Sequence, residues 1–571
     1  MDQILECVPN FSEGRNPAII REISFAIENV PGVKLLDVSS GRATNRTVVT
    51  FAGEPEAVVE AAFRGIQKAS QLIDMRKHKG EHPRFGATDV CPLVPVANIS
   101  MEDTIKYALQ LAERVGNDLS VPVYCYEYAA SSEERRSLAS CRMGGYEGLQ
   151  KRLLTERWKP DFGPDLWSEK VAKTGAVAIG ARNFLIAYNI NLNTTSTQIA
   201  QSIALDVRES GRLKREGGTG TGKVLTDDNG NPLRTPGPLK KTRALGWFIE
   251  EFGIAQVSMN LTDISVTPVH TAFEEVVAKA GERGVRVTGS ELIGLIPLQA
   301  MLDAGKYFLH KQKRPSGVPD EEIIKIAVRS LGLDELQPFE PEKKIIEYLL
   351  REEEGKRLTD KPLAKFVADT STESLAPGGG SVSAAIGAMG AALGGMVANM
   401  SVQKSGWEGR WKEFSDWAEK AAELYKLMLQ CVEEDAEAFI KLNHAMKLPD
   451  AGDQEKKFRD ESVKAASAEA IKVPLKVMKL SFKSLDVLQA MVETGNPVLV
   501  TDAGVGAIAA RAAIEGGFLS VKINAVNDPD NPDIYEILKQ AEQLSIAARK
   551  KESEILRITD EKIEGLKQPG F

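Results

Sequence analysis

His78 to Pro92 reads HKGEHPRFGATDVCP, and this stretch holds two of the five histidines of the chain. Pro83 excludes an ordinary helix interior here and favours an extended conformation for His82. The two histidines, four residues apart, therefore do not form a helical metal-binding pair. Histidine titrates near neutrality, so both are candidates for proton transfer; the alternative is that both are solvated loop residues. The apolar run that follows, Val90 to Ala97, is expected to enter the core.

Around this stretch, short apolar runs alternate with amphipathic segments, as is typical of α/β subdomains. The expected order is strand, helix, two strands and helix, and a similar pattern recurs after Gly180. A further strand near Val121 to Tyr126 is expected to complete a ferredoxin-like unit. Two such subdomains leave a crevice between them, which is a common place for a ligand. The expected strands are residues 3–10, 33–37, 46–51, 184–191, 255–261 and 285–288, and the expected helices are residues 17–30, 55–73, 196–209 and 271–283.

A basic, glycine-rich segment, Gly211 to Arg243, interrupts the second of these units. Within it, GGTGTGK (Gly217 to Lys223) is close to a Walker A loop, but Val224 stands where Ser or Thr would coordinate magnesium. No strand is expected before the first glycine, so we exclude nucleotide hydrolysis. The segment is either a surface insertion rich in turns or a patch that attracts an anionic substrate tail. Its cationic candidates are Lys214, Arg215, Lys223, Lys240, Lys241 and Arg243.

Beyond the prolines of QPFEP (337–341), the pattern is helical almost throughout. Asp435 falls on the apolar stripe of a long helix, flanked by Glu433 and Glu434, which are expected to face solvent. A carboxylate on such a stripe is costly to bury without partners. Asp435 is therefore either an acid–base group or half of an interhelical ion pair. The stripe contains Phe414, Trp417, Ala421, Leu424, Met428, Cys431, Ala438 and Leu442, and further helices are expected at 456–479 with a kink at Pro474, at 485–493, at 504–515 with Asp502 as cap, and at 535–563.

Residues 374–403 carry no charged side chain, a length at which a membrane-spanning helix has to be considered. Alanine and glycine dominate the stretch, so its hydrophobicity is low and a buried helix is expected instead. Gly390 and Gly394 lie one turn apart and allow close helix packing, within the chain or in an oligomer.

Length, charge and cysteine content limit the possible classes of protein. A chain of 571 residues is expected to contain several domains. Its net charge of −8 argues against general nucleic-acid binding. Five cysteines without a CxxC pair indicate reduced thiols in the cytoplasm and no zinc site. The N-terminus lacks a basic region ahead of an apolar run, so no secretory signal is expected.

Several strings in this chain resemble those of known folate enzymes. The first half resembles glutamate formiminotransferases, and the second half resembles formiminotetrahydrofolate cyclodeaminases. Together they make the chain similar, nearly end to end, to the fused formiminotransferase-cyclodeaminase family. The strings are CVPNFSEG (7–14), TNRTV (44–48), HKGEHPR (78–84) and DFGP (161–164), then APGGGS (376–381) and DAEAF (435–439).

The resemblance implies two ferredoxin-like α/β sandwich subdomains followed by an all-α domain. The expected boundaries are 1–181 and 182–330 for the two formiminotransferase subdomains, 331–341 for a linker and 342–571 for the cyclodeaminase domain. The chain is further expected to be a homo-oligomer that binds no nucleic acid and does not insert into a membrane.

The resemblance further implies a bifunctional enzyme of histidine degradation. The first reaction transfers the formimino group from N-formimino-L-glutamate to tetrahydrofolate, and the second cyclodeaminates the product to 5,10-methenyltetrahydrofolate and ammonia. His82 is implied as the acid–base residue of transfer and Asp435 as that of cyclodeamination. Tetrahydrofolate, in polyglutamylated form, is the implied co-substrate, without a metal or nucleotide cofactor. The implied folate contacts are Gly163, Pro164, Asp165, Leu166, Trp167, Ser168, Glu169, Lys170, Val171 and Ala172.

Two alternatives stay open. The chain is a formyl- or formiminotransferase fused to a methenyltetrahydrofolate cyclohydrolase-like domain, or it is an inactive assembly scaffold.

The GGGS turn, Gly378 to Ser381, is expected to open a helix whose backbone N–H groups approach the folate.

Overall fold

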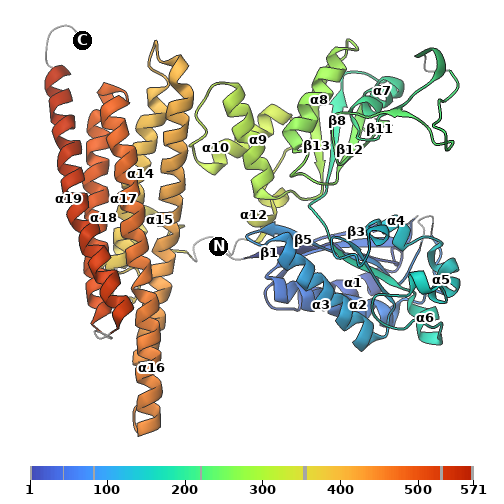
Figure 1. The fold of residues 1–571 in the computed structure, drawn as a ribbon, viewed down its shortest axis with the longest axis horizontal. Helices are drawn as coiled ribbons and strands as arrows, with labels where there is room; N and C mark the ends of the chain where they lie inside the picture. The colour runs from blue at the N-terminus through green and yellow to red at the C-terminus, as the bar shows by residue number, and fades with distance from the viewer. Residues whose placement is uncertain are drawn as a thin grey trace. The chain divides into compact units, whose positions relative to one another are not determined.

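The computed structural model describes residues 3–42, 44–80, 84–218, 222–350, 357–526 and 531–566. The chain divides into two compact units (Figure 1). The first contains Met1–Ala304 and Val328–Arg351, and the second contains Gly305–Ala327 and Glu352–Phe571.

A seven-stranded sheet forms the N-terminal subdomain of the first unit. Its order is β3-β4-β1/β2-β5-β7-β6, because β1 and β2 share one strand position and both pair with β4 and β5. The pairs are antiparallel as far as β5, and β7 and β6 continue the sheet in parallel. The elements are β1 Ile4–Cys7, β2 Asn10–Phe11, α1 Pro17–Glu28, β3 Val33–Gly41, β4 Arg46–Gly53, α2 Pro55–Leu72, β5 Thr88–Ala97, α3 Met101–Leu119, β6 Val123–Glu127 and β7 Val177–Ala181.

The ferredoxin-like unit is closed by β5, and the expectation that residues 121–126 close it was wrong. Strands β5, β1, β4 and β3 lie in the 4-1-3-2 order of that fold, whereas β6 is the edge strand of an extension. A central strand with Pro92 and Pro95 breaks the usual pattern, since proline removes a ladder donor. The strand keeps its carbonyl acceptors: Val8 N donates to Pro92 O and Arg182 N to Leu93 O.

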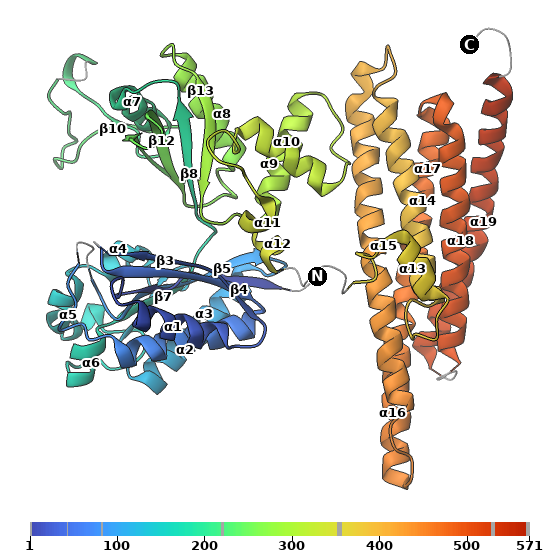
Figure 2. The ribbon, with the colours of Figure 1, turned by 180° about the vertical axis from the view of Figure 1, so that it is seen from behind.

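Helices α1, α2 and α3 cover one face of this sheet (Figure 2). Phe51, Ile27 and Leu111 belong to the buried cluster between them. The far side of β5, β7 and β6 is covered by α5 (Gly145–Leu153) and α6 (Glu169–Thr174), through Leu149 and Val171.

The second subdomain is another ferredoxin-like unit, which confirms the expected recurrence. Its four-stranded antiparallel sheet has the order β11-β12-β8-β13. Strand β11 was not predicted, because it follows directly on the basic segment. As an edge strand, β11 leaves Leu245, Trp247 and Phe248 between 40 and 50% exposed. The elements are β8 Ile186–Leu192, α7 Thr197–Val207, β11 Thr242–Ile249, β12 Ile254–Leu261, α8 Val269–Gly281 and β13 Val287–Ile293.

The glycine-rich segment ahead of β11 forms a separate two-stranded sheet, here called the excursion. Strand β9 (Arg212–Leu213) pairs with β10 (Arg234–Thr235), and bridges join Arg215 to Val224 and Thr226 to Pro232. Described residues of the GGTGTGK string thus lead into this excursion and not into a helix, so the string is no Walker A loop. Residues 219–221 lie outside the described part.

Four helices follow β13: α9 Leu298–Lys311, α10 Asp320–Leu331, α11 Pro341–Lys344 and α12 Ile346–Leu350. A bridge between Ile345 and Ile296 attaches α11 and α12 to the first unit. The expected cyclodeaminase boundary at residue 342 stays a prediction.

The part of the second unit described after residue 356 is all-helical, as expected. Two local expectations were wrong. The helix expected at 456–479 is two helices that meet at Ile471, and Pro474 lies in the first turn of α17, where a missing N–H costs no helix bond. Asp502 lies inside the first turn of α18 and does not cap it. The helices are α13 Leu363–Thr370, α14 Gly379–Ser401, α15 Trp411–Met446, α16 Asp453–Ala470, α17 Lys472–Thr494, α18 Val500–Ala525 and α19 Pro532–Leu566.

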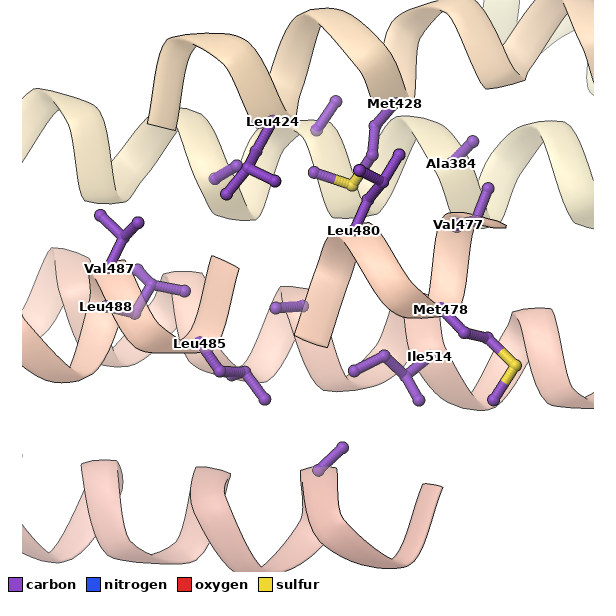
Figure 3. Packing of buried hydrophobic residues seen from close by; sticks show 14 of the residues in the cluster. Ala384, Leu424, Met428, Val477, Met478, Leu480, Leu485, Val487, Leu488 and Ile514 are labelled. Atoms are coloured by element: carbon purple, nitrogen blue, oxygen red, sulfur yellow. The ribbon is translucent and has the colours of Figure 1, made fainter. Parts of the chain in front are cut away.

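Helix α14 packs tightly against its neighbours because its buried residues are small. A Cβ atom on Gly390 would approach Gly506 O of α18 to 2.8 Å, and Gly394 faces Val487 of α17. These glycines therefore pack within the chain. Figure 3 shows the adjoining core, where Ala384 of α14, Leu424 and Met428 of α15, Leu480 and Leu488 of α17 and Ile514 of α18 are drawn.

By length and composition, two described helices are apolar enough to cross a membrane, Gly379–Ser401 and Pro497–Ala525. The first is mostly buried inside the second unit, as the core helix of a soluble domain would be.

One buried carboxyl in the first sheet makes stability depend on pH. Glu6 on β1 is 4% exposed, and burial raises its pKa from 4.5 to about 7, against the opposing charge of Arg182. Folding therefore takes up a proton between these two pH values.

We expect Glu6→Gln to match the unmodified chain at pH 4 and to exceed it increasingly as the pH rises to 7. Above pH 7 the gain in unfolding free energy should stay constant at about 3 kcal/mol. Urea titrations at pH 4, 6 and 8, monitored by hydrogen exchange in β1, measure this gain in unfolding free energy. The exposed Glu102→Gln serves as control, and equal stability of Glu6→Gln and the unmodified chain at pH 8 would contradict the raised pKa.

Candidate functional site

Three of the strings singled out in the sequence come together in the first unit. Asn10 of CVPNFSEG pairs with Val48 of TNRTV on one side and with Val90 of β5 on the other. The strand β2 is thereby held between the second string and the strand that follows HKGEHPR.

Asn45 joins the loops of all three strings. Its left-handed backbone (φ 51°) turns the side chain inward. The Oδ1 atom accepts from Gly14 N at 2.9 Å, and Nδ2 donates to Lys79 O at 3.0 Å. The carbonyl oxygen of Asn45 lies 2.8 Å from His78 Nε2. One asparagine thus fixes the start of the HKGEHPR loop.

His78 belongs to this framework. Because a carbonyl oxygen only accepts, Nε2 of His78 carries the proton that it shares with Asn45. The ring is 8% exposed, and Nδ1 is buried without a partner among the described residues. His78 therefore donates to the backbone of Asn45 and shapes the loop.

Arg84 fastens the other end of the loop. It donates to Met75 O at 2.7 Å and to His78 O, pairs with Glu147 at 2.8 Å, and stacks over the Tyr146 ring at 4.7 Å. The described residues on both sides of 81–83 are therefore held by hydrogen bonds. His82 lies between them but outside the described residues, so no contact of His82 is described.

A charged cluster lies beside β2. The carboxylate of Asp89 is 1% exposed, and its Oδ2 contacts Arg46 at 2.9 Å and Arg142 at 2.5 Å. Burial lowers the pKa of Arg46, while Asp89 acts against that shift. Arg46 also donates to Asn10 Oδ1 at 3.0 Å. Two guanidinium groups share one carboxylate, which leaves an excess positive charge at this end of the sheet.

The DFGP string is built into the far edge of the same sheet. Asp161 accepts from Cys125 N at 2.8 Å and pairs with Arg135 at 2.8 Å. Gly163 has a φ of 82° and lies against Val121 O, where no side chain fits. This part of the string is structural, and it directs the chain into the expected folate segment.

The expected folate segment, residues 163–172, lies against the HKGEHPR loop. Tyr146, stacked under Arg84, is 6.0 Å from the Trp167 ring and donates its hydroxyl to Ala172 O. Ser168 caps α6, and Leu166 is 64% exposed. The structure thus brings the two predicted site segments of the first unit together.

Several residues of this region were not singled out by sequence reasoning. Arg84 and Asp89 stand within the quoted stretch, but nothing in their spacing assigned them partners. Arg142 and Tyr146 lie in a segment without any recognised string, and only the fold places them against Asp89 and Arg84.

The second candidate site is the carboxyl of Asp435, on the inner face of α15. Its Oδ2 accepts from Ser381 Oγ at 2.9 Å. Burial raises the pKa of Asp435, and the hydrogen bonds from the Ser381 hydroxyl and backbone N–H act in the opposite direction. Among the described residues no cation pairs with Asp435, so the interhelical ion pair considered above is not formed.

Asp435 opens onto a cavity of about 430 Å³. One wall is the start of α14, which the GGGS turn opens as expected, with Gly378 as N-cap. A Cβ atom on Gly380 would overlap with Asp435 Oδ1, so a side chain there would displace the carboxyl. The other walls are mainly apolar, with Leu375, Ala438, Phe439, Leu519 and Ile523.

The neighbours of Asp435 on α15 are bonded and half-buried; the expectation that they face solvent was wrong. Glu433 accepts from Thr359 N and Oγ1 at 2.9 Å, and Glu434 pairs with Lys476 of α17 at 2.9 Å. Glu433 and Glu434 thus bind Thr359 and Lys476, whereas Asp435 is the carboxyl that lines the cavity.

Comparison with known proteins shows which family the chain belongs to. A model described as "Formiminotransferase domain, N-terminal subdomain" matches residues 4–182, and one described as "Formiminotransferase domain" matches residues 187–351. A third, "Formiminotransferase-cyclodeaminase", matches residues 362–543.

Three relatives illustrate the range of matches. Formimidoyltransferase-cyclodeaminase from Mus musculus is 42% identical over 93% of this chain and 94% of its own length. Glutamate formimidoyltransferase from Thermoplasma acidophilum is 42% identical over 54% of this chain and 92% of its own length. Methenyltetrahydrofolate cyclohydrolase from Methylorubrum extorquens is 31% identical over 31% of this chain and 86% of its own length.

We expect Gly80→Ala to open the loop of the first site. A Cβ atom at Gly80 would overlap with the Thr44 carbonyl oxygen, and a backbone carbonyl cannot move aside as a side chain does. The free energy of local opening should fall by about 1–3 kcal/mol. Hydrogen exchange in peptides that cover residues 74–86 measures this loss.

Gly148→Ala is the matched control, because a Cβ atom there has open space around it. Unchanged exchange in Gly80→Ala, or an equal increase in both variants, would contradict the tight fit at Gly80.

Proposed function

Because the chain belongs to the formiminotransferase-cyclodeaminase family, we propose that its two sites act in sequence on one folate. The chain transfers the formimino group of N-formimino-L-glutamate to tetrahydrofolate and then cyclodeaminates the product, releasing ammonia. The observation that carries this assignment is the presence of two separate sites, the loop around HKGEHPR in the first unit and Asp435 at a cavity in the second.

In the transfer reaction, N5 of tetrahydrofolate loses a proton as it attacks the formimino carbon, and the glutamate nitrogen gains one as it leaves. We assign both proton transfers to His82, acting first as base and then as acid. The framework supports this, since Asn45 and Arg84 hold the loop on both sides of it. Its neighbour His78 donates to a carbonyl and is not available for this work.

The Arg46–Asp89–Arg142 cluster suits the carboxylates of N-formimino-L-glutamate. Its two guanidinium groups are half-buried, and they can donate charge-assisted hydrogen bonds to a carboxylate. We assign the folate to residues 163–172, which pack against the same loop through Tyr146.

In the cyclodeamination, N10 of the folate attacks the formimino carbon and loses its proton, and the amino group gains a proton and departs as ammonia. Asp435 is placed to carry that proton, because burial raises its pKa toward the range useful for acid–base work. The start of α14 offers backbone N–H groups to the ligand in the same cavity.

The alternatives considered above differ in their products. A cyclohydrolase-like second domain would hydrolyse methenyl-folate but would release no ammonia from formimino-folate, and a scaffold would do neither. Retention of Asp435 with a hydrogen-bond donor at a cavity argues against a scaffold.

We also propose that the chain is a cytoplasmic homo-oligomer. All five cysteines are unpaired and buried, which suits a reducing compartment. On α18, Val505 and Ile508 are 55 and 43% exposed, as is typical of a surface that another subunit covers. Light scattering of the purified chain tests the assembly.

A pair of variants separates the two reactions. We expect His82→Ala to lose transfer by about a hundredfold or more while it cyclises supplied 5-formiminotetrahydrofolate normally. Asp435→Asn should show the reverse, with intact folding, because no buried cation loses its partner. A coupled assay that follows ammonia and methenyl absorbance measures both steps. Transfer at the normal rate by His82→Ala, or ammonia release by Asp435→Asn, would remove that residue from the mechanism.

We further propose that the folate is bound as its polyglutamate. Burial raises the pKa of Glu127 at the end of β6, and four cationic side chains act against that shift. They therefore surround one carboxyl with an excess of positive charge. The four are Lys241, Arg182, Arg136 and Arg243.

We expect Lys241→Gln combined with Arg243→Gln to weaken pentaglutamyl folate about tenfold more than the monoglutamate, because each added carboxylate meets this charge. The difference should shrink in 0.5 M salt, as the KM values for both folates will show. Lys214→Gln with Lys223→Gln, in the excursion, is the control pair. Equal loss for both folates would indicate that the basic segment is a surface insertion and does not bind the glutamate tail.

A further inference from the structure

Ser381 makes the closest polar contact of the Asp435 carboxyl. It is the third residue of α14 and is fully buried. Its Oγ atom lies 2.9 Å from Asp435 Oδ2 and 3.1 Å from the carbonyl oxygen of Val432. A serine hydroxyl has one proton, so it donates to one of these two acceptors at a time.

We propose that Ser381 is a positioning residue for cyclodeamination, which serves Asp435 in both protonation states by switching its hydrogen bond between two acceptors. The inference rests on the proposed role of Asp435 as the proton carrier of this reaction.

With Asp435 charged, the Ser381 hydroxyl donates to Oδ2, and the Ser381 backbone N–H donates to the same carboxylate. Once Asp435 has taken the proton of N10, its own O–H needs an acceptor. The Ser381 hydroxyl then accepts from Asp435 and turns its proton to Val432 O. That carbonyl has a second lone pair besides the one used within α15.

The proton count balances over the cycle. One proton moves from N10 to Asp435 and from Asp435 to the departing amino group, while the proton of Ser381 never leaves its oxygen. Since Ser381 stays bonded in both states, the carboxyl keeps one orientation toward the cavity. Gly380 limits other orientations, because Asp435 Oδ1 fills the space of its absent side chain.

Few charged groups compete with Ser381 for Asp435. Helix α14 carries no charged side chain. On α15, the thiol of Cys431 is buried one turn away, and Glu434 is paired with Lys476 of α17. From α16 and α18, the cavity receives Ala470, Ser520 and Asn524, which are uncharged. Ser381 is thus the described group whose hydrogen bonds act against the effect of burial on Asp435.

The test compares Ser381→Thr with Ser381→Val, two side chains of nearly equal size, of which only threonine keeps a hydroxyl. The readout is the pH profile of ammonia release from 5-formiminotetrahydrofolate by the full chain. Without the hydroxyl, the charged form of Asp435 loses a donor, so its pKa rises. We expect the acid limb for the valine variant to move up by about one pH unit and kcat to fall about tenfold, with KM little changed.

The threonine variant should keep the unmodified profile. If both variants match the unmodified chain, or if both shift equally, the hydroxyl is not what positions Asp435 and the proposal is overturned. Ser381→Ala, which adds no volume, repeats the measurement should the larger side chains disturb α14. It should shift as the valine variant does, and an unshifted profile would also overturn the proposal.

Two controls separate this inference from the function on which it rests. Ser484→Ala removes another fully buried hydroxyl of the same unit, which donates only to Leu480 O within α17, and should leave the profile unchanged. Formimino transfer by the first unit reports the integrity of each variant. Ammonia release by Asp435→Asn would overturn the proposed function itself, whereas its loss, together with an unshifted Ser381→Val, overturns the role of Ser381 alone.

Discussion

Close approach of a backbone to a polar group, possible only at glycine, is the constraint on which both sites depend. In the first unit Gly80 lies against the Thr44 carbonyl, and this contact lets Asn45 bond the loop of His78. In the second unit Gly380 lies against Asp435, and this contact brings the Ser381 hydroxyl within hydrogen-bond distance. A side chain at either glycine would separate groups whose function requires contact.

The sequence allowed the fold class and many of the helices and strands to be predicted, because apolar periodicity reports burial. It placed Asp435 correctly on the inner face of a long helix. It did not indicate that β5 closes the first ferredoxin-like unit, since two prolines argue against a central strand. Arg142 could not have been found either, because an ion pair between distant segments leaves no local pattern. The role of Ser381 depends on which turn of α15 it meets, and this is a property of helix packing alone.

The two proposed reactions need the same kind of proton transfer, but different residue types are assigned to it. Each reaction moves a proton from one nitrogen to another, so a single group that first accepts and then donates is sufficient. In the first unit the assigned group is a histidine, which titrates near neutrality without help. In the second it is a carboxyl, which must be buried to approach that range, and burial requires a donor such as Ser381 to keep the charged form accessible.

Strand β11 ends its sheet with an unpaired edge and three exposed apolar side chains, Leu245, Trp247 and Phe248. An unpaired strand edge can pair with the strands of other chains, and basic residues beside the edge disfavour this pairing. The excursion ends directly at this strand, and Lys240, Lys241 and Arg243 lie exposed around its first residues. Their charge guards the newly made chain against aggregation before the sheet has folded, so trimming the excursion for crystallisation should stop short of Lys240.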